Sequence, residues 1–462
     1  MLLGLLFVAG CSGPSGSACA VKSDCFSQES CVDGRCQSVV VSKDASSDPS
    51  TADVSGADVS SADAPAQGDA DGGQTPSCEA VTQCIHGDGC CPQSCSHLSD
   101  TDCLQVEEIA AGAQHSCARL LDGSVHCWGW NESGQLGDAT LQVRRRPTLA
   151  VGLEPALEIA AGWSFTCARH ADLGVSCWGH NSLGQLGQPV SGGSSSAQRI
   201  DGLVAVEITT GNQHACARLG DGTVQCWGDN RYGQLGDTTK TSRHTPGPVA
   251  GIVNAVEIAA GGLHTCARLA SGSVQCWGRN FWGQLGDGTD ATAETNEDLA
   301  DKTSPVSVRN LSTAVEISAA FHHSCARLAD HSVQCWGSNE HGKIGAPLAT
   351  SNRNTPQTVP GLTRASEVAT GRHHTCARLS DGTVWCWGLN AQGQLGDQTL
   401  ESRRTPAPVP GLNTAAGLAA GNGHTCVRLT DASARCFGDN IYGQLGNDTT
   451  AEQSSQPVEL AW

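Results

Sequence analysis

One phrase recurs seven times between residue 106 and the C-terminus, and its period limits the folds that are open to the chain. The first copy reads EIAAGAQHSCARLLDGSVHCWGWNESGQLGD, residues 108–138. Each copy holds two cysteines ten residues apart, and successive first cysteines are 50, 49, 50, 59, 51 and 50 residues apart. A period near 50 is typical of propellers and solenoids, because each repeat buries its apolar surface only against its neighbours.

The period divides into four short strands. Glu-Ile-Ala-Ala is the first and ends at a glycine, and His-Thr-Cys-Ala-Arg-Leu is the second. An Asp-Gly pair, which favours a tight hairpin, leads to the third strand, Val-x-Cys-Trp-Gly. A glycine-rich turn and a Pro-Val segment follow, and proline suits an edge strand because it has no amide to donate to a ladder. Four short antiparallel strands per repeat predict a propeller blade.

The count of fourth strands indicates how the ring closes. A Pro-Val segment, or a degenerate form of it, follows each of the first six copies, at 146–151, 198–203, 245–250, 304–309, 355–360 and 405–410. The seventh lies at the extreme C-terminus, and nothing equivalent precedes the first copy. We therefore expect an all-β, seven-bladed propeller over residues 105–462. Its C-terminal strand, 455–462, is expected to complete the first blade and leave no open sheet edge.

The repeat resembles the regulator of chromosome condensation repeat family. The matching series is the histidine, then Asp-Gly, Trp-Gly, Asn and Gly-Gln-Leu-Gly, and it extends over the whole predicted propeller. The resemblance implies a seven-bladed propeller, which agrees with the count of copies. The founding activity of the family is guanine-nucleotide exchange on a small GTPase with chromatin attachment. A secreted bacterial β-lactamase inhibitor of the same fold shows the scaffold at work outside the cytoplasm.

Two cysteines straddle the hairpin turn of each copy, so they would stand nearly opposite one another on neighbouring strands. The alternative is that they are small buried apolar residues. Familiar nuclear members of the family have apolar or hydroxyl residues at many of these positions, and 25 cysteines in one chain indicate an oxidising compartment. We predict seven disulfides within blades: Cys117–Cys127, Cys167–Cys177, Cys216–Cys226, Cys266–Cys276, Cys325–Cys335, Cys376–Cys386 and Cys426–Cys436.

The first eleven residues, MLLGLLFVAGC, hold an apolar run that is too short to span a membrane. Its end resembles the bacterial lipoprotein signal, which implies a signal peptide over 1–11 and a lipid on Cys11. Ser12 in place of aspartate implies the outer membrane. No Lys or Arg precedes the run, which departs from the pattern, and a plain secretory signal is the alternative. Both interpretations place the mature chain in the cell envelope or outside the cell.

Two cysteine-rich modules and a linker would precede the propeller. Residues 12–40 hold four cysteines, and residues 78–104 hold six, enough for three disulfides, with zinc ligation as the alternative. Residues 41–77 carry seven Asp and one Lys among small residues, which predicts a disordered acidic tether. Asp88, Asp100 and Asp102 are calcium candidates that are more simply explained as turn residues. We expect no cofactor and assign no metal site.

Two residue series recur once per copy. A histidine stands two residues before the first cysteine in six copies, and Phe165 takes its place in the second. A tryptophan follows the second cysteine in six copies, and Phe437 takes its place in the last. A metal site needs different ligands that converge on one point. We therefore interpret both series as packing and hydrogen-bonding residues between blades.

Function is expected on the loops that break the repeat. The turns after strands one and three share one face of a four-stranded meander, and they carry large side chains that are expected to be exposed. Aromatic residues and arginine are typical of interface hot spots. The alternative is that they cap blade ends. The candidate binding residues are Trp130, Trp163, Arg231, Tyr232, Phe281, Trp282, Phe321, Arg372 and Tyr442.

The formal net charge of −19 argues against nucleic acid and anionic membrane surfaces, since both require clustered Lys and Arg. We find no HExxH, GxSxG or phosphate-loop motif, so the chain is not expected to be an enzyme. We predict a monomeric, envelope-anchored scaffold that binds a protein partner through the loop face. The alternatives are an exchange-factor-like regulator, by family analogy, and a secreted enzyme inhibitor or hydrolase.

Overall fold

The computed structural model describes residues 29–32, 35–38, 104–189, 192–289, 300–346 and 351–462. The chain divides into two compact units, Met1–Gly73 and Gln74–Trp462. In the first unit, β1 (Glu29–Val32) and β2 (Arg35–Ser38) form an antiparallel hairpin in which Cys31 pairs in register with Cys36. Among the described residues, no helix is both long and apolar enough to cross a membrane.

Several predictions for the N-terminal region lie outside the described residues. They concern the signal peptide with Cys11, the tether over 41–77, and the six cysteines of 78–103 with Asp88, Asp100 and Asp102. They stay predictions.

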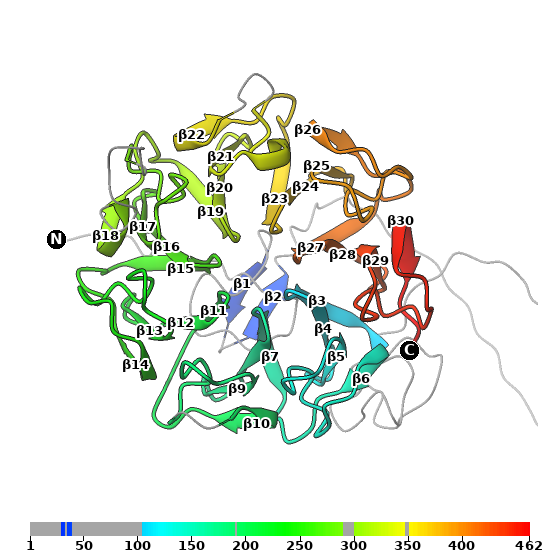
Figure 1. Ribbon diagram of the computed structural model, residues 1–462, viewed down its shortest axis with the longest axis horizontal. Coiled ribbons are helices and arrows are strands. Elements are labelled where there is room, and N and C mark those ends of the chain that lie inside the picture. Colours follow the sequence, from blue (N-terminus) through cyan, green and yellow to red (C-terminus); the bar gives the residue numbers. More distant parts are fainter. Residues whose placement is uncertain (1–28, 33–34, 39–103, 190–191, 290–299, 347–350) are drawn as a thin grey trace, which may run out of the picture. The chain divides into compact units, whose positions relative to one another are not determined.

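The described part of the second unit is a propeller of seven four-stranded antiparallel sheets, as the repeat predicted (Figure 1). We number the blades 1 to 7 in chain order. The innermost strands are β3 (Val106–Ala111), β7 (Ala156–Ala161), β11 (Glu207–Thr210), β15 (Ala255–Ala260), β19 (Ala314–Ala319), β23 (Ala365–Thr370) and β27 (Ala415–Ala420). The second strands are β4 (His115–Leu120), β8 (Phe165–His170), β12 (His214–Arg218), β16 (His264–Leu269), β20 (His323–Leu328), β24 (His374–Leu379) and β28 (His424–Leu429).

The two outer strands of each blade follow. The third strands are β5 (Val125–Gly129), β9 (Val175–Gly179), β13 (Val224–Gly228), β17 (Val274–Gly278), β21 (Val333–Gly337), β25 (Val384–Gly388) and β29 (Ala434–Asp439). The outermost strands are β6 (Arg144–Leu149), β10 (Ser194–Arg199), β14 (Arg243–Pro248), β18 (Lys302–Ser307), β22 (Arg353–Thr358), β26 (Arg403–Pro408) and β30 (Gln453–Glu459).

The outermost strands begin earlier than the Pro-Val segments suggested. In blade 1 the strand starts at Arg144, which pairs with Gly129, and the register then shifts before Thr148 pairs with Cys127. The proline therefore lies inside the edge strand, in the stretch where the ladder is interrupted. That position suits a residue that has no amide to donate.

The C-terminal strand does not complete the first blade, contrary to our expectation. β30 pairs with β29 of blade 7, and blade 1 takes its outer strand, β6, from its own repeat. Each repeat supplies its four strands in order from the channel outward, so the last Pro-Val segment belongs to the seventh repeat. Blades 7 and 1 meet side to side instead. The Val106 amide donates to the Ala432 carbonyl at 2.8 Å, and Arg146 forms an ion pair with Asp448.

The hydrophobic cores lie between neighbouring blades. The core between blades 1 and 2 holds the Cys117–Cys127 disulfide of blade 1 and Trp178 of blade 2. The core between blades 7 and 1 is built in the same way, with Cys426–Cys436 and Trp128. All seven predicted disulfides are present in the structure, and in each the two cysteines are register partners on adjacent strands.

The histidine and tryptophan series join each blade to its neighbour, as expected. In the seam between blades 1 and 2, the Trp178 indole N–H and the Thr166 hydroxyl both donate to the Gln135 carbonyl at 2.9 Å. Because the Thr166 proton is used there, the His115 Nε2–H donates to the Thr166 oxygen, also at 2.9 Å. These groups are fully buried, so each bond is protected from water.

Candidate binding face at the channel mouth

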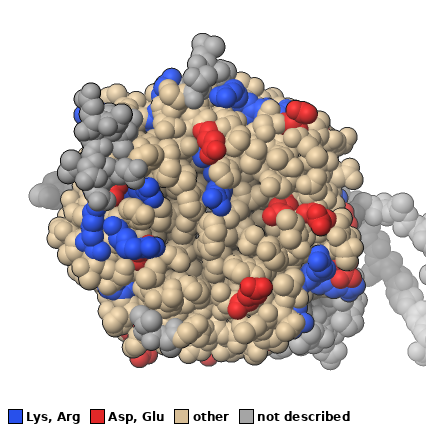
Figure 2. All heavy atoms as spheres, viewed as in Figure 1, with Lys and Arg blue, Asp and Glu red and all other residues tan. Residues whose placement is uncertain are grey.

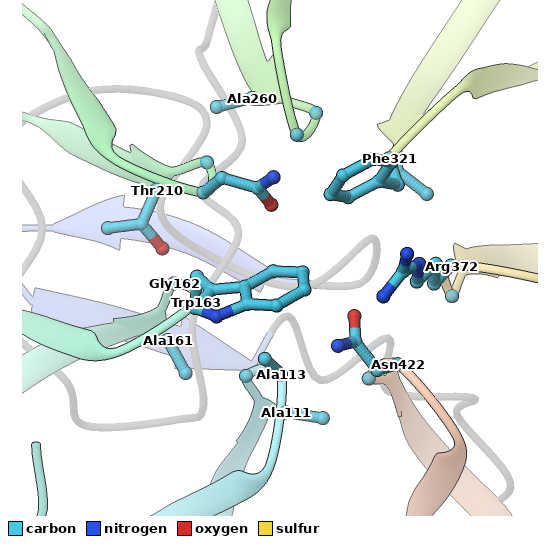
Figure 3. A pocket seen from close by; sticks show the side chains of 18 of the residues that line it. Ala111, Ala113, Ala161, Gly162, Trp163, Thr210, Ala260, Phe321, Arg372 and Asn422 are labelled. Carbon is cyan, nitrogen blue, oxygen red and sulfur yellow. The ribbon is translucent and has the colours of Figure 1, made fainter. Parts of the chain in front are cut away.

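The inner strands end at a ring of residues around one mouth of the channel. Where the first strand of each blade stops, a Gly-x or Ala-x pair turns the chain toward the second strand, and these pairs line a hollow on the propeller axis. The second residue of each pair varies between blades: Ala113, Trp163, Asn212, Gly262, Phe321, Arg372 and Asn422. Figure 3 shows Trp163, Phe321, Arg372 and Asn422 directed into this hollow.

Three of the predicted binding residues meet across the channel mouth. Trp163 of blade 2 and Phe321 of blade 5 have ring centroids 5.8 Å apart. The Arg372 guanidinium of blade 6 lies 5.4 Å from the Trp163 centroid and 4.6 Å from the Phe321 centroid, within cation–π distance of both rings. The propeller thus brings Trp163, Phe321 and Arg372, which lie far apart in the sequence, into contact at the channel mouth.

A second cluster continues outward from Phe321 over blades 4 and 3. The His322 ring lies against Trp282 at a tilt of 34°, with 3.6 Å between centroids, and Phe281 and Trp282 form a T-shaped pair with centroids 4.8 Å apart. Arg279 spans the cluster, 4.9 Å from the Trp282 centroid and 4.5 Å from the Tyr232 centroid. Burial, reinforced by Lys343 and Arg279, lowers the pKa of His322, so the imidazole is neutral at physiological pH.

A groove connects these two clusters. It is lined by Trp163, Asn212, Gln213, Arg231, Tyr232, Leu263 and Phe321. Arg231 is held at its rim by Asp229, whose carboxylate is fully buried and lies 2.9 Å from the guanidinium Nε. The guanidinium also donates to Gln213 at 3.3 Å. We call Trp163, Tyr232, Arg279, Trp282, Phe321 and Arg372 the aromatic arc.

The predicted residues are less exposed than expected. Arg231 is exposed, but the aromatic residues and Arg372 are half-buried because they pack on one another. Trp130 and Tyr442 do not join the aromatic arc. They form a separate pair on blades 1 and 7, with ring centroids 6.0 Å apart.

The acidic insert in blade 4 is described only at its edges. From the sequence, the extra residues of the 59-residue spacing, near Gly288–Lys302, are expected on the binding face, where they carry Asp290, Glu294, Glu297, Asp298 and Asp301. Residues 290–299 lie outside the described residues, so for the first four of these acidic residues this stays a prediction. Asp301 is not an exposed loop charge. Its side chain is only 3% exposed, and it accepts the Asn280 amide at 3.1 Å. Viewed down the propeller axis, the charged side chains lie in small separate groups on a mostly uncharged surface (Figure 2).

Blade 5 departs from the repeat beside the aromatic arc. Where the other copies have the glutamine of Gly-Gln-Leu-Gly, this blade has Lys343, which is fully buried and donates to the Arg372 carbonyl at 3.4 Å. Burial lowers the pKa of Lys343 to about 8. A buried amine that stays charged at neutral pH adds positive charge next to Arg372.

Sequence reasoning placed the arc residues on one face but missed Arg279 and Lys343. Arg279 follows the Trp-Gly pair, at a position that other blades fill with Trp, His, Asp, Ser or Leu. That variability was the available signal. Lys343 breaks the Gly-Gln-Leu-Gly series, and a lysine that replaces a buried glutamine could have been found in the same way.

Models of known families match most of the chain. The RCC1-like domain matches residues 68–363. The regulator of chromosome condensation (RCC1) repeat matches residues 365–394, 381–428 and 416–444.

Similar curated proteins share short stretches with the chain. The human probable E3 ubiquitin-protein ligase HERC3 is 33% identical over 104 residues, and protein pim1 of Schizosaccharomyces pombe is 31% identical over 118 residues. Each stretch covers 22% of this chain, but only 10% of HERC3 and 22% of pim1. The chain therefore spans less than a quarter of either relative.

Solved structures share the fold over most of the chain. Yeast RCC1 (Prp20), in complex with Kap60, has a TM-score of 0.66 at 20% identity and covers 78% of this chain and 85% of its own. Human WBSCR16 has a TM-score of 0.62 at 23% identity and covers 70% of this chain and 85% of its own. At these identities the likeness establishes the fold alone.

Proposed function

The chain belongs to the RCC1-like domain family, and from that premise we propose that its propeller is a non-enzymatic scaffold that binds a protein partner through the aromatic arc. The observation that carries the proposal is the convergence of Trp163, Phe321 and Arg372 at the channel mouth. Aromatic rings provide much contact area for little lost side-chain entropy, and aromatic residues and arginine dominate the binding energy of known interfaces. A rigid propeller holds them in place before the partner arrives.

The uneven distribution of the large side chains also supports a binding role. Six equivalent inter-blade positions are filled by one repeated tryptophan, which packing explains. The mouth positions vary between blades and range from glycine to tryptophan, so packing within a blade does not dictate them. This variation is what we expect of a surface shaped for one particular partner.

We place this scaffold outside the cytoplasm, anchored to the cell envelope. The support is the set of seven buried disulfides, which persist in oxidising compartments, and the lipoprotein-like N-terminus. A guanine-nucleotide exchange factor would need access to a cytosolic GTPase. Prp20p of Saccharomyces cerevisiae has binding properties toward Gsp1p and histones, but its likeness to this chain, at 20% identity, extends to the fold alone.

Crosslinking on intact cells, followed by mass spectrometry, tests the proposal. The test variant is Tyr232→Ala with Trp282→Ala, and the matched control is Trp130→Ala with Tyr442→Ala, which removes the same two residue types from the same propeller. We expect the first variant to lose the crosslinked partner and the control to keep it, with similar melting temperatures. Unchanged crosslinks in the first variant would refute this surface. Recovery of only cytosolic GTPases would refute the location.

A further inference from the structure

Three side chains with metal-binding atoms meet at the seam between blades 5 and 6. Glu340 and His341 belong to the turn after β21, and His373 to the turn before β24. The carboxylate oxygens and imidazole nitrogens of the three residues all lie within 4.8 Å of one another. This is the one such group of three or more His, Cys, Asp or Glu among the described residues.

The spacing within this group fits a shared ion better than hydrogen bonds. Glu340 Oε1 lies 3.5 Å from His341 Nε2, and Glu340 Oε2 lies 3.6 Å from His373 Nδ1. Both distances are longer than ordinary hydrogen bonds. Two ligand atoms bound at about 2.0–2.2 Å to a tetrahedral zinc ion are separated by about 3.4 Å. The two observed separations are close to that value, each measured from a different oxygen of the Glu340 carboxylate.

The turn that carries two of these residues differs from its equivalents. In blade 1 the Gln135 side chain accepts the amide of Ser133 at 3.0 Å, which shapes the turn. In blade 5 Lys343 and His341 take the places of Gln135 and Ser133. The Lys343 side chain has no oxygen, so it cannot accept the His341 amide. The turn becomes the short 3-10 helix η4 (Glu340–Gly342), and His341 adopts a φ of 59°. A positive φ is costly for a residue other than glycine, and such residues concentrate at functional sites.

His373 supplies a second, independent observation. Its Nδ1 is buried and has no hydrogen-bond partner among the described residues, and it faces the Glu340 carboxylate. A buried polar atom without a partner calls for an explanation, and a bound ion would provide one. The neighbouring cation Lys343 has a partner of its own, since its ammonium group donates to the Arg372 carbonyl at 3.4 Å.

We propose that Glu340, His341 and His373 form a site for a divalent transition metal ion, with Zn²⁺ as the best fit. Two imidazoles and one carboxylate suit Zn²⁺, Co²⁺ and Ni²⁺, whereas Ca²⁺ and Mg²⁺ prefer oxygen ligands alone. Three protein ligands leave a tetrahedral ion one position for water or for a group from a partner. Because Lys343 and Arg372 are close, we expect weaker binding than at a closed structural zinc site.

Metal titration of the full chain, prepared without a histidine tag, tests the site. Co²⁺ is followed by its visible absorption, and Zn²⁺ by calorimetry and by displacement of Co²⁺. The test variants are His373→Ala and His341→Asn. Asparagine tolerates a positive φ, so the second variant keeps the shape of the turn. His244→Ala, which removes an exposed histidine from β14, is the control.

We expect the wild type and His244→Ala to bind one more equivalent of Co²⁺ than His373→Ala or His341→Asn, or to bind it at least tenfold more tightly. Melting curves without metal establish whether each variant is folded. If His373→Ala does not fold, His341→Asn alone provides the test. Equal stoichiometry and affinity in the wild type and in the folded test variants would place any bound metal elsewhere and overturn the proposal. The result does not depend on the aromatic arc.

Discussion

Phe165 and Ala215 face each other across the seam between blades 2 and 3, in the place where every other seam pairs a histidine with a serine or threonine hydroxyl. Both are buried in one core. The remaining six pairs have a histidine Nε2 within 2.9 Å of the hydroxyl oxygen on the next blade. The polar pair is therefore exchanged as a unit for an apolar pair, because a lone histidine would be left buried without a partner for its Nε2, and a lone hydroxyl would lose its histidine donor.

A double-mutant cycle at the first seam tests this coupling. Thr166→Ala leaves the His115 N–H without an acceptor, and His115→Phe places a ring against the hydroxyl. We expect the double variant to be more stable than the sum of the single effects predicts, by about 1 kcal/mol. Urea unfolding of the four proteins measures this coupling. Additive effects would contradict it.

The same double variant should be less sensitive to acid than the wild type. Burial lowers the pKa of His115 to about 3, so the folded protein keeps this ring neutral while the unfolded chain takes up a proton below about pH 6.5. The contribution of His115 to stability is thus complete above pH 6.5 and is lost as the pH falls toward 3. Relative to the wild type, the variant should gain up to ~1.4 kcal/mol per pH unit in that window.

Comparison of the double variant with the wild type separates the effect of His115 from that of buried glutamates, which changes stability with pH in the opposite direction. Burial raises the pKa values of Glu158, Glu207 and Glu316 to about 7, so these groups bind protons in the folded state first and add stability as the pH falls from 7 to about 4.5. Both proteins contain all three glutamates. Urea midpoints at pH 8, 6, 5 and 4 provide the measurement, and a constant difference between the proteins would count against a neutral His115.

Thiol titration tests the disulfides. We expect the cysteines of the seven blades to stay unreactive in unfolded protein until a reductant is added, because each is bonded to the cysteine ten residues away. Closing such a short loop stabilises each blade by about 2–3 kcal/mol. Reduction should therefore lower the melting temperature sharply. Many free thiols before reduction would contradict both the bridges and the oxidising compartment.

Substitution of Gly417 should strengthen the seam that closes the ring. In the other six blades a glutamate at this position bonds an arginine of its own blade and accepts an amide of the next blade. Glu367, for example, bonds Arg378 and accepts the Leu418 amide, both at 2.9 Å. A Cβ at Gly417 meets no atom closer than 3.5 Å, so a side chain fits there.

We expect Gly417→Glu to raise the free energy of unfolding by about 1 kcal/mol more than Gly417→Ala does. The alanine variant separates the gain from reduced backbone freedom, which both substitutions share. Urea unfolding at pH 8 compares them. Equal effects would mean that the glutamate makes no bond to blade 1.

The sequence was sufficient for the parts of the fold that repeat. Strand order, blade count and the cysteine pairing follow from local patterns, and a pair such as Cys117 and Cys127 is separated by a single hairpin. The predicted closure of the ring was wrong because we assigned the C-terminal strand to the first blade, although it completes the seventh. Which blade a strand joins depends on pairings that its own residues do not specify.

The candidate sites could be predicted only in part. The side chains of the arc were identified because they break the repeat, but the contact between Trp163 and Phe321 depends on the curvature that brings blades 2 and 5 to one axis. Glu340, His341 and His373 were missed because no short motif joins them. They become neighbours only when the seam between two blades forms.

The seam between blades 7 and 1 has a further consequence for how such a chain can be rearranged. Leu104 and Leu460, near the two ends of the propeller, pack against the same core, and this core has the disulfide and the aromatic residue of its counterparts. The folded ring therefore does not determine at which blade the chain has to begin. Circular permutation, with these ends joined and new ends opened between any other two blades, should preserve every core. Evolution could likewise have built the ring by tandem duplication of one blade-sized unit.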